Sequence, residues 1–173
     1  MLTIRRYEPP DAGPTLEVFR AAVRVTARAD YSEEQTRAWA SRGERPGWHE
    51  RRAATETWVA EADDVVVGFA DRDDAGFIGM LFVHPTAGGR GVARALIERL
   101  VESAQAAALS TLRTHASLTA RPAFERLEFA PDPTGNSTDI DAGTHDPSGA
   151  QAVLIGNVAF TNYRLLRRLR PLP

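Results

Sequence analysis

Hydrophobic residues recur every three or four positions over residues 91–108, with charged residues between them, and this spacing predicts an amphipathic helix. The segments at 77–84 and 111–117 on either side are short and mainly apolar or alternating, which predicts two strands. A strand, a helix and a second strand in this order normally form a right-handed crossover between parallel strands. The pattern therefore predicts an α/β fold built around this β-α-β unit.

Both flanks of this unit predict further short elements. Asp11 and Ser32 stand where helix N-caps are expected, and Gln35 would complete a capping box with Ser32. Turn residues at 63–64 and 156–157 predict two hairpins, whereas the glycines and proline of residues 41–48 predict an irregular segment. The other expected elements are strands at 3–7, 57–61, 65–70, 150–155 and 157–166, and helices that follow Asp11, follow Ser32 and span 120–127.

Chain length and composition predict one domain over residues 1–173. The 173 residues, 43% of them hydrophobic, suit a single core. The segment 131–149 stands apart because it holds six Gly or Pro residues and four Asp but no aromatic residue. We expect a flexible surface insertion there, and a lid over the active site is the functional alternative.

Composition excludes several classes of function. The 21 basic and 23 acidic residues give a net charge of -2, so the chain lacks the positive field expected of a protein that binds nucleic acid or an anionic membrane. Cysteine is absent and every basic residue is arginine, which excludes thiol and lysine nucleophiles. The four histidines lack the spacing of a metal site, and no apolar segment approaches the roughly 20 residues that span a bilayer. We therefore expect a cytoplasmic protein without a bound metal.

The turn before the long helix carries the clearest chemistry. A strand runs into a turn that contains Gly88, Gly89 and Gly91 and then directly into the helix. Backbone N–H groups at the start of a helix lack intrahelical partners and face the positive end of its dipole, and glycine lets a bulky anion approach them. Arg90 and Arg94 add positive charge at the same end. The pattern predicts a pyrophosphate site, although a plain strand-to-helix turn that uses glycine for packing stays open at this point.

The same turn resembles the pyrophosphate loop of the GCN5-related N-acetyltransferase (GNAT) family, Q/R-x-x-G-x-G/A, which aligns from Gly88 with Gly88-Gly89-Arg90-Gly91-Val92-Ala93. Two further segments stand in the order in which that family keeps its other motifs, Leu81-Phe82-Val83-His84-Pro85 and Arg121-Pro122-Ala123-Phe124. The stretches at 31–40 and 159–163 are similar to a YafP-like subgroup. The likeness covers residues 3 to about 129 and the last hairpin, and it leaves out 131–149.

The resemblance implies a GNAT-like acyl-CoA N-acyltransferase fold, with a mixed central sheet, a pyrophosphate-binding β-α-β core and flanking helices. It also implies that acetyl-CoA is the cosubstrate and that its acetyl group passes directly to an amine of a small acceptor. The pantetheine would pair with the backbone of Leu81 and Val83, beside a backbone N–H that stabilises the oxyanion. The implied cofactor-binding residues are Leu81, Phe82, Val83, Gly88, Gly89, Arg90, Gly91, Val92, Ala93, Arg94, Ser117 and Phe124.

Two positions depart from the family pattern. Gly88 stands where the family prefers Gln or Arg, which removes a side-chain contact but keeps the amide donors. Phe124 stands where many relatives have a tyrosine that protonates the departing thiolate, which weakens the reaction without forbidding it. The first candidate for this catalytic role is Tyr163 and the second is Tyr31, with Ser117 and water as further substitutes.

The acceptor site is the least determined part. The amine must lose a proton, yet no base stands out, and the candidates are chosen only for their closeness in sequence: His84, Asp71, Asp73 and Glu61. An apolar acceptor pocket could be lined by Trp39, Trp48, Trp58 and Tyr31, with core packing the expected role of Trp58.

A second class of function is a catalytically quiet acyl-CoA sensor or a protein-interaction module, which the missing tyrosine and the missing base would permit. Both hypotheses predict CoA binding. Release of the free CoA thiol from acetyl-CoA in the presence of amines distinguishes them. The sequence leaves the acceptor and the oligomeric state open, a homodimer included.

Overall fold

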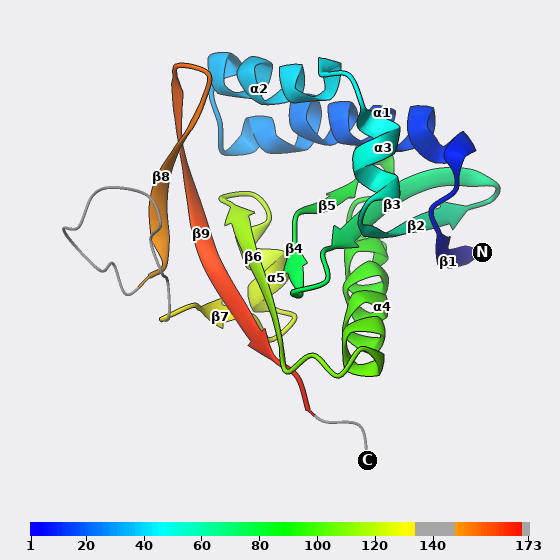
Figure 1. The fold of residues 1–173 in the computed structure, drawn as a ribbon. Helices are drawn as coiled ribbons and strands as arrows, with labels where there is room; N and C mark the ends of the chain where they lie inside the picture. The colour runs from blue at the N-terminus through cyan, green and yellow to red at the C-terminus, as the bar shows by residue number, and fades with distance from the viewer. Residues whose placement is uncertain (134–147, 171–173) are drawn as a thin grey trace.

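The computed structural model describes residues 1–133 and 148–170, which form two sheets flanked by helices (Figure 1). The first sheet has the antiparallel strand order β1 (Leu2–Arg6), β2 (Glu56–Ala62), β3 (Val65–Arg72) and β5 (Met80–Val83). The second has the order β4 (Phe77–Ile78), β6 (Thr111–Ser117), β9 (Val158–Arg168) and β7 (Ala130–Pro131), and β8 (Ala150–Ile155) also pairs with β9. The helices are α1 (Ala12–Ala21), α2 (Glu33–Ala40), α3 (Trp48–Ala53), α4 (Val92–Ala106) and α5 (Arg121–Glu125).

The expected β-α-β unit is present, but its first strand is not continuous. β4 pairs with β6 in parallel, and α4 lies between them in sequence, as its apolar spacing predicts. After Gly79 the chain leaves β6 and continues as β5, which pairs with β3 of the other sheet. The prediction of a single strand at 77–84 was wrong, because an apolar run does not show which neighbour each half of it pairs with.

A buried carboxylate fixes this break. Asp71 Oδ1 accepts the N–H groups of Gly79 and Met80, at 3.2 and 2.9 Å, which supplies the partner that a buried backbone donor needs. Asp71 Oδ2 pairs with Arg52 Nη1, and the exposed fractions of the two side chains are only 4% and 7%. Burial raises the pKa of Asp71, while the charge of Arg52 acts against this rise. β5 and β6 therefore diverge from a point that a buried ion pair holds in place.

The helix starts differ in how well the sequence predicts them. The capping box is confirmed, because Gln35 N–H donates to Ser32 Oγ and Ser32 N–H donates to Gln35 Oε1. Asp11 was expected to cap α1, but its side chain makes no cap hydrogen bond there. Its carboxylate instead accepts both Nη groups of Arg5 and the N–H of Glu8. Asp11 therefore acts one turn earlier than expected, in the capping box of the 3-10 turn at Pro9–Asp11, and also pairs with Arg5 of β1.

The segment at 41–48, expected to be irregular, contains a 3-10 turn at Ser41–Glu44 and leads into α3. α3 was not predicted. It has only six residues and begins after Gly47, whose φ of 82° suits glycine. Both hairpin turns are confirmed, with Asp63 and Asp64 at φ of 50° and 64°.

The first sheet separates two hydrophobic clusters. Ala70 packs with Leu96 of α4, whereas its neighbour Phe69 packs with Phe19 of α1, because successive residues of a strand face opposite sides. All four are at most 1% exposed. Burying a large apolar side chain contributes about 1.5–3 kcal/mol. These contacts hold α1 and α4 on opposite faces of the sheet (Figure 1).

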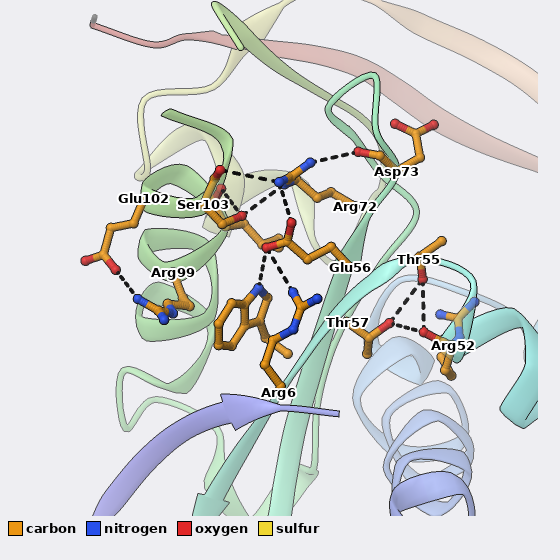
Figure 2. Close-up of polar contacts among 12 residues, drawn as sticks. Arg6, Arg52, Thr55, Glu56, Thr57, Arg72, Asp73, Arg99, Glu102 and Ser103 are labelled. Carbon is orange, nitrogen blue, oxygen red and sulfur yellow. Dashed lines mark hydrogen bonds and ion pairs between the residues drawn. The ribbon is translucent and has the colours of Figure 1, made fainter. Parts of the chain in front are cut away.

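Trp58 has a packing role beside α4. Its indole N–H donates to Glu56 at 2.9 Å, and the guanidinium groups of Arg6 and Arg99 lie 4.9 and 4.2 Å from the centroid of its ring. Glu56 also pairs with the buried Arg72, and Figure 2 shows the side chains of Arg6, Glu56, Arg72 and Arg99 close together beside α4. The expectation that Trp58 serves packing is confirmed.

Most of the predicted insertion at 131–149 lies outside the described residues, which stop at 133 and resume at 148. Its two described ends both bind β9. The N–H of Asp132 donates to the carbonyl of Arg164 at 3.0 Å, and the N–H of Arg164 donates to the carbonyl of Gly149 at 2.8 Å. Among the described residues, no helix is long and apolar enough to cross a bilayer.

Candidate active site

The divergence of β5 from β6 opens two adjoining cavities. The loop-side cavity, of about 490 Å³, is bordered by β5, the turn at 87–91, the start of α4 and residues 119–127. The arginine-side cavity, of about 540 Å³, is bordered by β5, β6, β8, β9 and the segment from α2 to α3. The residues that line both are Trp39, Leu81, Phe82, Ser117 and Ala120. Ligands in the two cavities can therefore meet at this shared wall.

The backbone edge of β5 is open. His84 N–H donates to the carbonyl of Val67 at 2.8 Å, so the backbone groups of His84 face β3. These groups alternate along an antiparallel strand, so Phe82 also faces β3, whereas Leu81 and Val83 direct their N–H and C=O groups to the other edge. β5 is the last strand of its sheet in the part of the chain that the structure describes. A ligand with amide groups can pair with this edge as another strand would.

The loop before α4 is shaped by backbone conformation. Gly89 and Gly91 have φ of 73° and 81°, which other residues rarely adopt, and a Cβ on either would meet no atom within 4 Å. Gly91 is the N-cap of α4, and its lack of a side chain leaves the first turn without a side-chain cap. Within residues 1–133 and 148–170, no turn or loop hydrogen bond uses the N–H of Gly89, Arg90 or Gly91. Free N–H groups, open space and the positive end of a helix together form an anion site.

Most of the residues predicted to bind the cofactor lie together. Those that line the loop-side cavity are Leu81, Phe82, Val83, Gly88, Gly89, Gly91, Val92, Ala93, Arg94 and Ser117. Arg90 is exposed in the loop but does not line the cavity. Phe124 is 2% exposed and lines the arginine-side cavity, with its ring edge-on to Phe129.

Tyr31 reaches the site. It lines the arginine-side cavity, where its hydroxyl donates to the carbonyl of Thr161 at 3.2 Å and accepts the N–H of Leu118 at 2.8 Å. Burial raises the pKa of Tyr31, while the bond from Leu118 acts in the opposite direction. The phenol is therefore neutral near pH 7, with its proton directed at a backbone carbonyl.

Tyr163 lies elsewhere. It lines neither cavity, and the guanidinium of Arg121 covers its ring at 4.1 Å from the centroid. Its neighbour Asn162 lines the arginine-side cavity, and successive residues of a strand face opposite sides. The register of β9 thus turns Tyr163 away from the place where the sequence-based hypothesis needs it.

The arginine-side cavity joins aromatic walls to a cluster of positive charge. Its aromatic residues are Phe19, Tyr31, Trp39, Trp48, Phe82, Phe124 and Phe160, and its arginines are Arg42, Arg45, Arg51 and Arg52. The lining found in the described residues contains no Asp or Glu. Trp39, Trp48 and Tyr31 thus take the positions that the sequence suggested, whereas Trp58 does not.

None of the four residues considered as bases lines either of these cavities. Each has a partner elsewhere: Asp71 at the strand break, Asp73 in the turn that follows, Glu61 with Arg5, and His84 with Thr86. Closeness in sequence therefore did not identify a base, because each of these side chains is directed at a partner away from the two cavities.

His115 also lines the arginine-side cavity. It projects from β6, with its ring edge-on to Phe77 at 5.0 Å between centroids. The ring is accessible from solvent, yet partial burial lowers its pKa and the charge of Arg164 lowers it further. It is therefore neutral near pH 7 and able to accept a proton. Within the described residues, no group of three or more His, Asp and Glu is arranged to hold a metal ion.

Comparison of sequences identifies the family. A model of the acetyltransferase (GNAT) domain matches residues 27–141. YafP of Escherichia coli (strain K12), described as an uncharacterized N-acetyltransferase, is 41% identical over 128 residues, which cover 74% of this chain and 81% of that protein. The chain belongs to the GNAT acetyltransferase family. It is thus an enzyme of the acyl-CoA-dependent N-acyltransferase class, as the resemblance implied.

Solved structures confirm the GNAT fold. A GCN5-related N-acetyltransferase from Rhodopseudomonas palustris has a TM-score of 0.84 and 29% identity, covering 96% of this chain and 95% of that one. PaiA N-acetyltransferase from Thermoplasma acidophilum, in complex with coenzyme A, has a TM-score of 0.69 and 13% identity, covering 97% and 99%. The structure of yncA from Salmonella typhimurium with its cofactor acetyl-CoA has a TM-score of 0.63 and 19% identity, covering 100% and 96%.

Two features of this GNAT acetyltransferase site were missed from the sequence. His115 had no pattern to mark it, because its place depends on how β6 diverges from β5. The arginines did leave a signal, since four of them fall between positions 42 and 52 of a chain with a net charge of -2. That local excess of positive charge could have been noticed, although not its place at a cavity.

Proposed function

We propose that the protein transfers the acetyl group of acetyl-CoA directly to an amine of a small acceptor. The observation that supports this most is the open β5 edge, where Leu81 and Val83 direct their backbone groups toward a cavity that ends at the free amides before α4. The amides of a pantetheine can pair with such an edge, and a pyrophosphate can bind such amides. The thioester would then lie at the wall that both cavities share.

The cosubstrate would be held mainly by backbone groups. The amides from Gly89 to Arg94 bind the pyrophosphate, and Arg94 adds charge. The N–H of Leu81, the first unpaired donor after the strand break, stabilises the oxyanion that develops on the thioester carbonyl. In support, Gly89 and Gly91 have open space where a side chain would stand, and Leu81 lines the loop-side cavity.

The chemistry requires one proton to leave the amine and one to reach sulfur. The amine nitrogen bonds to the thioester carbon, the C–S bond breaks, and CoA leaves as a thiolate that is then protonated. We assign the loss of the amine proton to His115, which is neutral near pH 7 and lines the acceptor side. Ser117, which lines both cavities, or water supplies the proton to sulfur. Tyr31 is less suited because its hydroxyl already donates to a carbonyl.

The size of the acceptor follows from the arginine-side cavity. Its volume of about 540 Å³ lies in the range of sites that hold small molecules. Its aromatic walls favour an acceptor with a planar or apolar part.

The test combines CoA binding with turnover. CoA should raise the unfolding temperature of the protein, and mixing acetyl-CoA with a panel of small amines should release free CoA thiol. Stabilisation without thiol release for any amine would favour the alternative of an acyl-CoA sensor. The absence of both stabilisation and release would contradict the proposal.

A further inference from the structure

We propose that the acceptor amine also carries an oxyanion group, a carboxylate or a phosphate, which binds the arginines of the arginine-side cavity. This rests on the proposed function, because it names the class of acceptor for that same site. The inference comes from the charge of the lining and from two buried polar atoms that have no hydrogen-bond partner in the part of the chain that the structure describes.

The cavity is strongly positive for its size. Arg42, Arg45, Arg51 and Arg52 line it, and no acidic residue does so among the described residues. Glu44 and Glu50 directly precede Arg45 and Arg51 in the sequence, but neither glutamate lines the cavity. Partial burial of the guanidinium lowers the pKa of Arg42, and the charges of Arg45 and Arg51 lower it further. Positive charges held this close repel one another, and a bound anion would relieve the repulsion.

Arg52 gives the cluster a buried anchor. Its side chain is 7% exposed, and only Nη1 is used, in the pair with Asp71. Nε is buried and has no hydrogen-bond partner among the described residues. The guanidinium also lies 5.3 Å from the centroid of the Trp48 ring, which fixes its position at the wall. A guanidinium with spare donors beside an aromatic wall is suited to bind an oxyanion.

Asn162 supplies a hydrogen-bond acceptor to the same cavity. Its Oδ1 is buried without a hydrogen-bond partner in the described residues, and the side chain lines the same cavity. Asn162 pairs in register with Ser117, which is part of the wall shared by the two cavities. The Oδ1 atom of Asn162 can accept hydrogen bonds from the N–H groups of an amine that lies beside the thioester. The cavity therefore has a hydrogen-bond acceptor for the amine at one wall and hydrogen-bond donors for an anion at another.

The first test compares matched compounds. Phenylalanine, its amide, 2-phenylethylamine and the corresponding aminophosphonate are offered with acetyl-CoA, together with the same four forms built on an aliphatic side chain. We expect thiol release to be about 10-fold to 100-fold faster, as kcat/KM, for the carboxylate or phosphonate forms, because hydrogen bonds to charged groups are the stronger ones. Equal or faster release with the uncharged forms would overturn the anion proposal and leave the acetyltransferase proposal intact.

A second readout does not depend on turnover. The same compounds are tested for thermal stabilisation of the CoA-loaded protein. If only the anionic forms stabilise the protein, the anion site is supported, whether or not acetylation follows. A lack of acetylation would then count against the proposed function and not against the anion site. If no anionic form is acetylated or stabilises the protein, the anion proposal is overturned.

Variants then locate the site. Arg42→Gln with Arg45→Gln changes exposed side chains, and it should raise KM for the anionic acceptor about 10-fold or more while CoA stabilisation stays the same. Arg52→Gln with Asp71→Asn removes the buried pair as a unit, which avoids leaving one charge unpaired. The matched control is Arg37→Gln, which removes an exposed arginine of α2 that lines neither cavity. If Arg37→Gln raised KM as much as Arg42→Gln with Arg45→Gln does, the result would contradict a local site.

Discussion

The loop-side and arginine-side cavities share a wall but are built from different kinds of groups. The first presents the backbone edge of β5 and the glycine turn before α4, two segments that are adjacent in sequence, together with side chains from residues 22–27 and 117–127. The second is formed by side chains from the segment 39–52, β5, β6, β8 and β9, which are far apart in sequence. A backbone site depends on φ angles and free N–H groups, whereas a side-chain site depends on the identity of each residue.

This difference suits the two cavities to two different ligands. Backbone donors bind a ligand part that does not vary, such as the pyrophosphate and amides of a coenzyme. In the proposed function, side chains such as Arg52 and Asn162 would determine which second molecule fits. Substitutions should therefore separate the two cavities, except where one residue supports both.

Asp71 is the residue on which both cavities depend, and its replacement should have the largest effect. In Asp71→Ala, Arg52 stays buried without its partner, and the N–H groups of Gly79 and Met80 lose their acceptor. We expect the free energy of unfolding, measured by urea denaturation, to fall by about 3–5 kcal/mol. Asp74→Ala, at an exposed position in the next turn, should change it by less than about 0.5 kcal/mol. Similar values for the two variants would show that Asp71 does not hold the strand break.

Gly91→Asp should disable the loop-side cavity alone. The added carboxylate would stand in front of the free amides, at a position where nothing in the protein fills the space. The stabilisation that CoA gives the parent at 100 times its Kd, about 2.7 kcal/mol, should be lost. Binding measured by thermal shift checks this.

The matched control for Gly91→Asp is Gly156→Asp. Gly156 also has a positive φ, of 61°, and open space, but it lies in the β8–β9 turn. Both substitutions should cost about 1–2 kcal/mol of backbone strain. Only Gly91→Asp should abolish the effect of CoA, and full CoA stabilisation in that variant would place the pyrophosphate elsewhere.

The two cavities also differ in how far the sequence predicts them. The glycine turn and α4 could be located because a local pattern determines a helix start and the amides in front of it. The strand break at Gly79 could not, because it depends on Asp71, eight residues away, and on Arg52 of an unpredicted short helix. The same limit applies to Tyr163 and His115, because the register of β6 and β9 decides which side chains face the cavity. Local backbone structure can thus be predicted from one sequence, whereas contacts between side chains that are far apart in the sequence cannot.

Replacement of His115 tests whether this residue acts as the base in the arginine-side cavity. Its pKa is lowered, so the acidic limb of the kcat/KM profile should lie below the ordinary histidine value of about 6.5, with the rate falling as the ring is protonated. In His115→Gln this limb should disappear, and kcat/KM at pH 7.5 should fall about 100-fold. CoA stabilisation should not change, since His115 does not line the loop-side cavity. An unaltered limb in the variant would assign the titration to another group.

Phe124→Tyr should have the smallest effect, and it concerns the boundary between the two cavities. Phe124 packs within the core and lines the arginine-side cavity, so an added hydroxyl would point into space beside the shared wall or displace the edge-on contact with Phe129. If the hydroxyl reaches the leaving sulfur, turnover rises by about 10-fold at most, because a thiolate of pKa near 8.5 already leaves readily. If it does not, turnover and CoA stabilisation stay as in the parent. A large loss of CoA stabilisation is the contradicting result, because it would mean that the Phe124 ring contacts the coenzyme rather than the acceptor side.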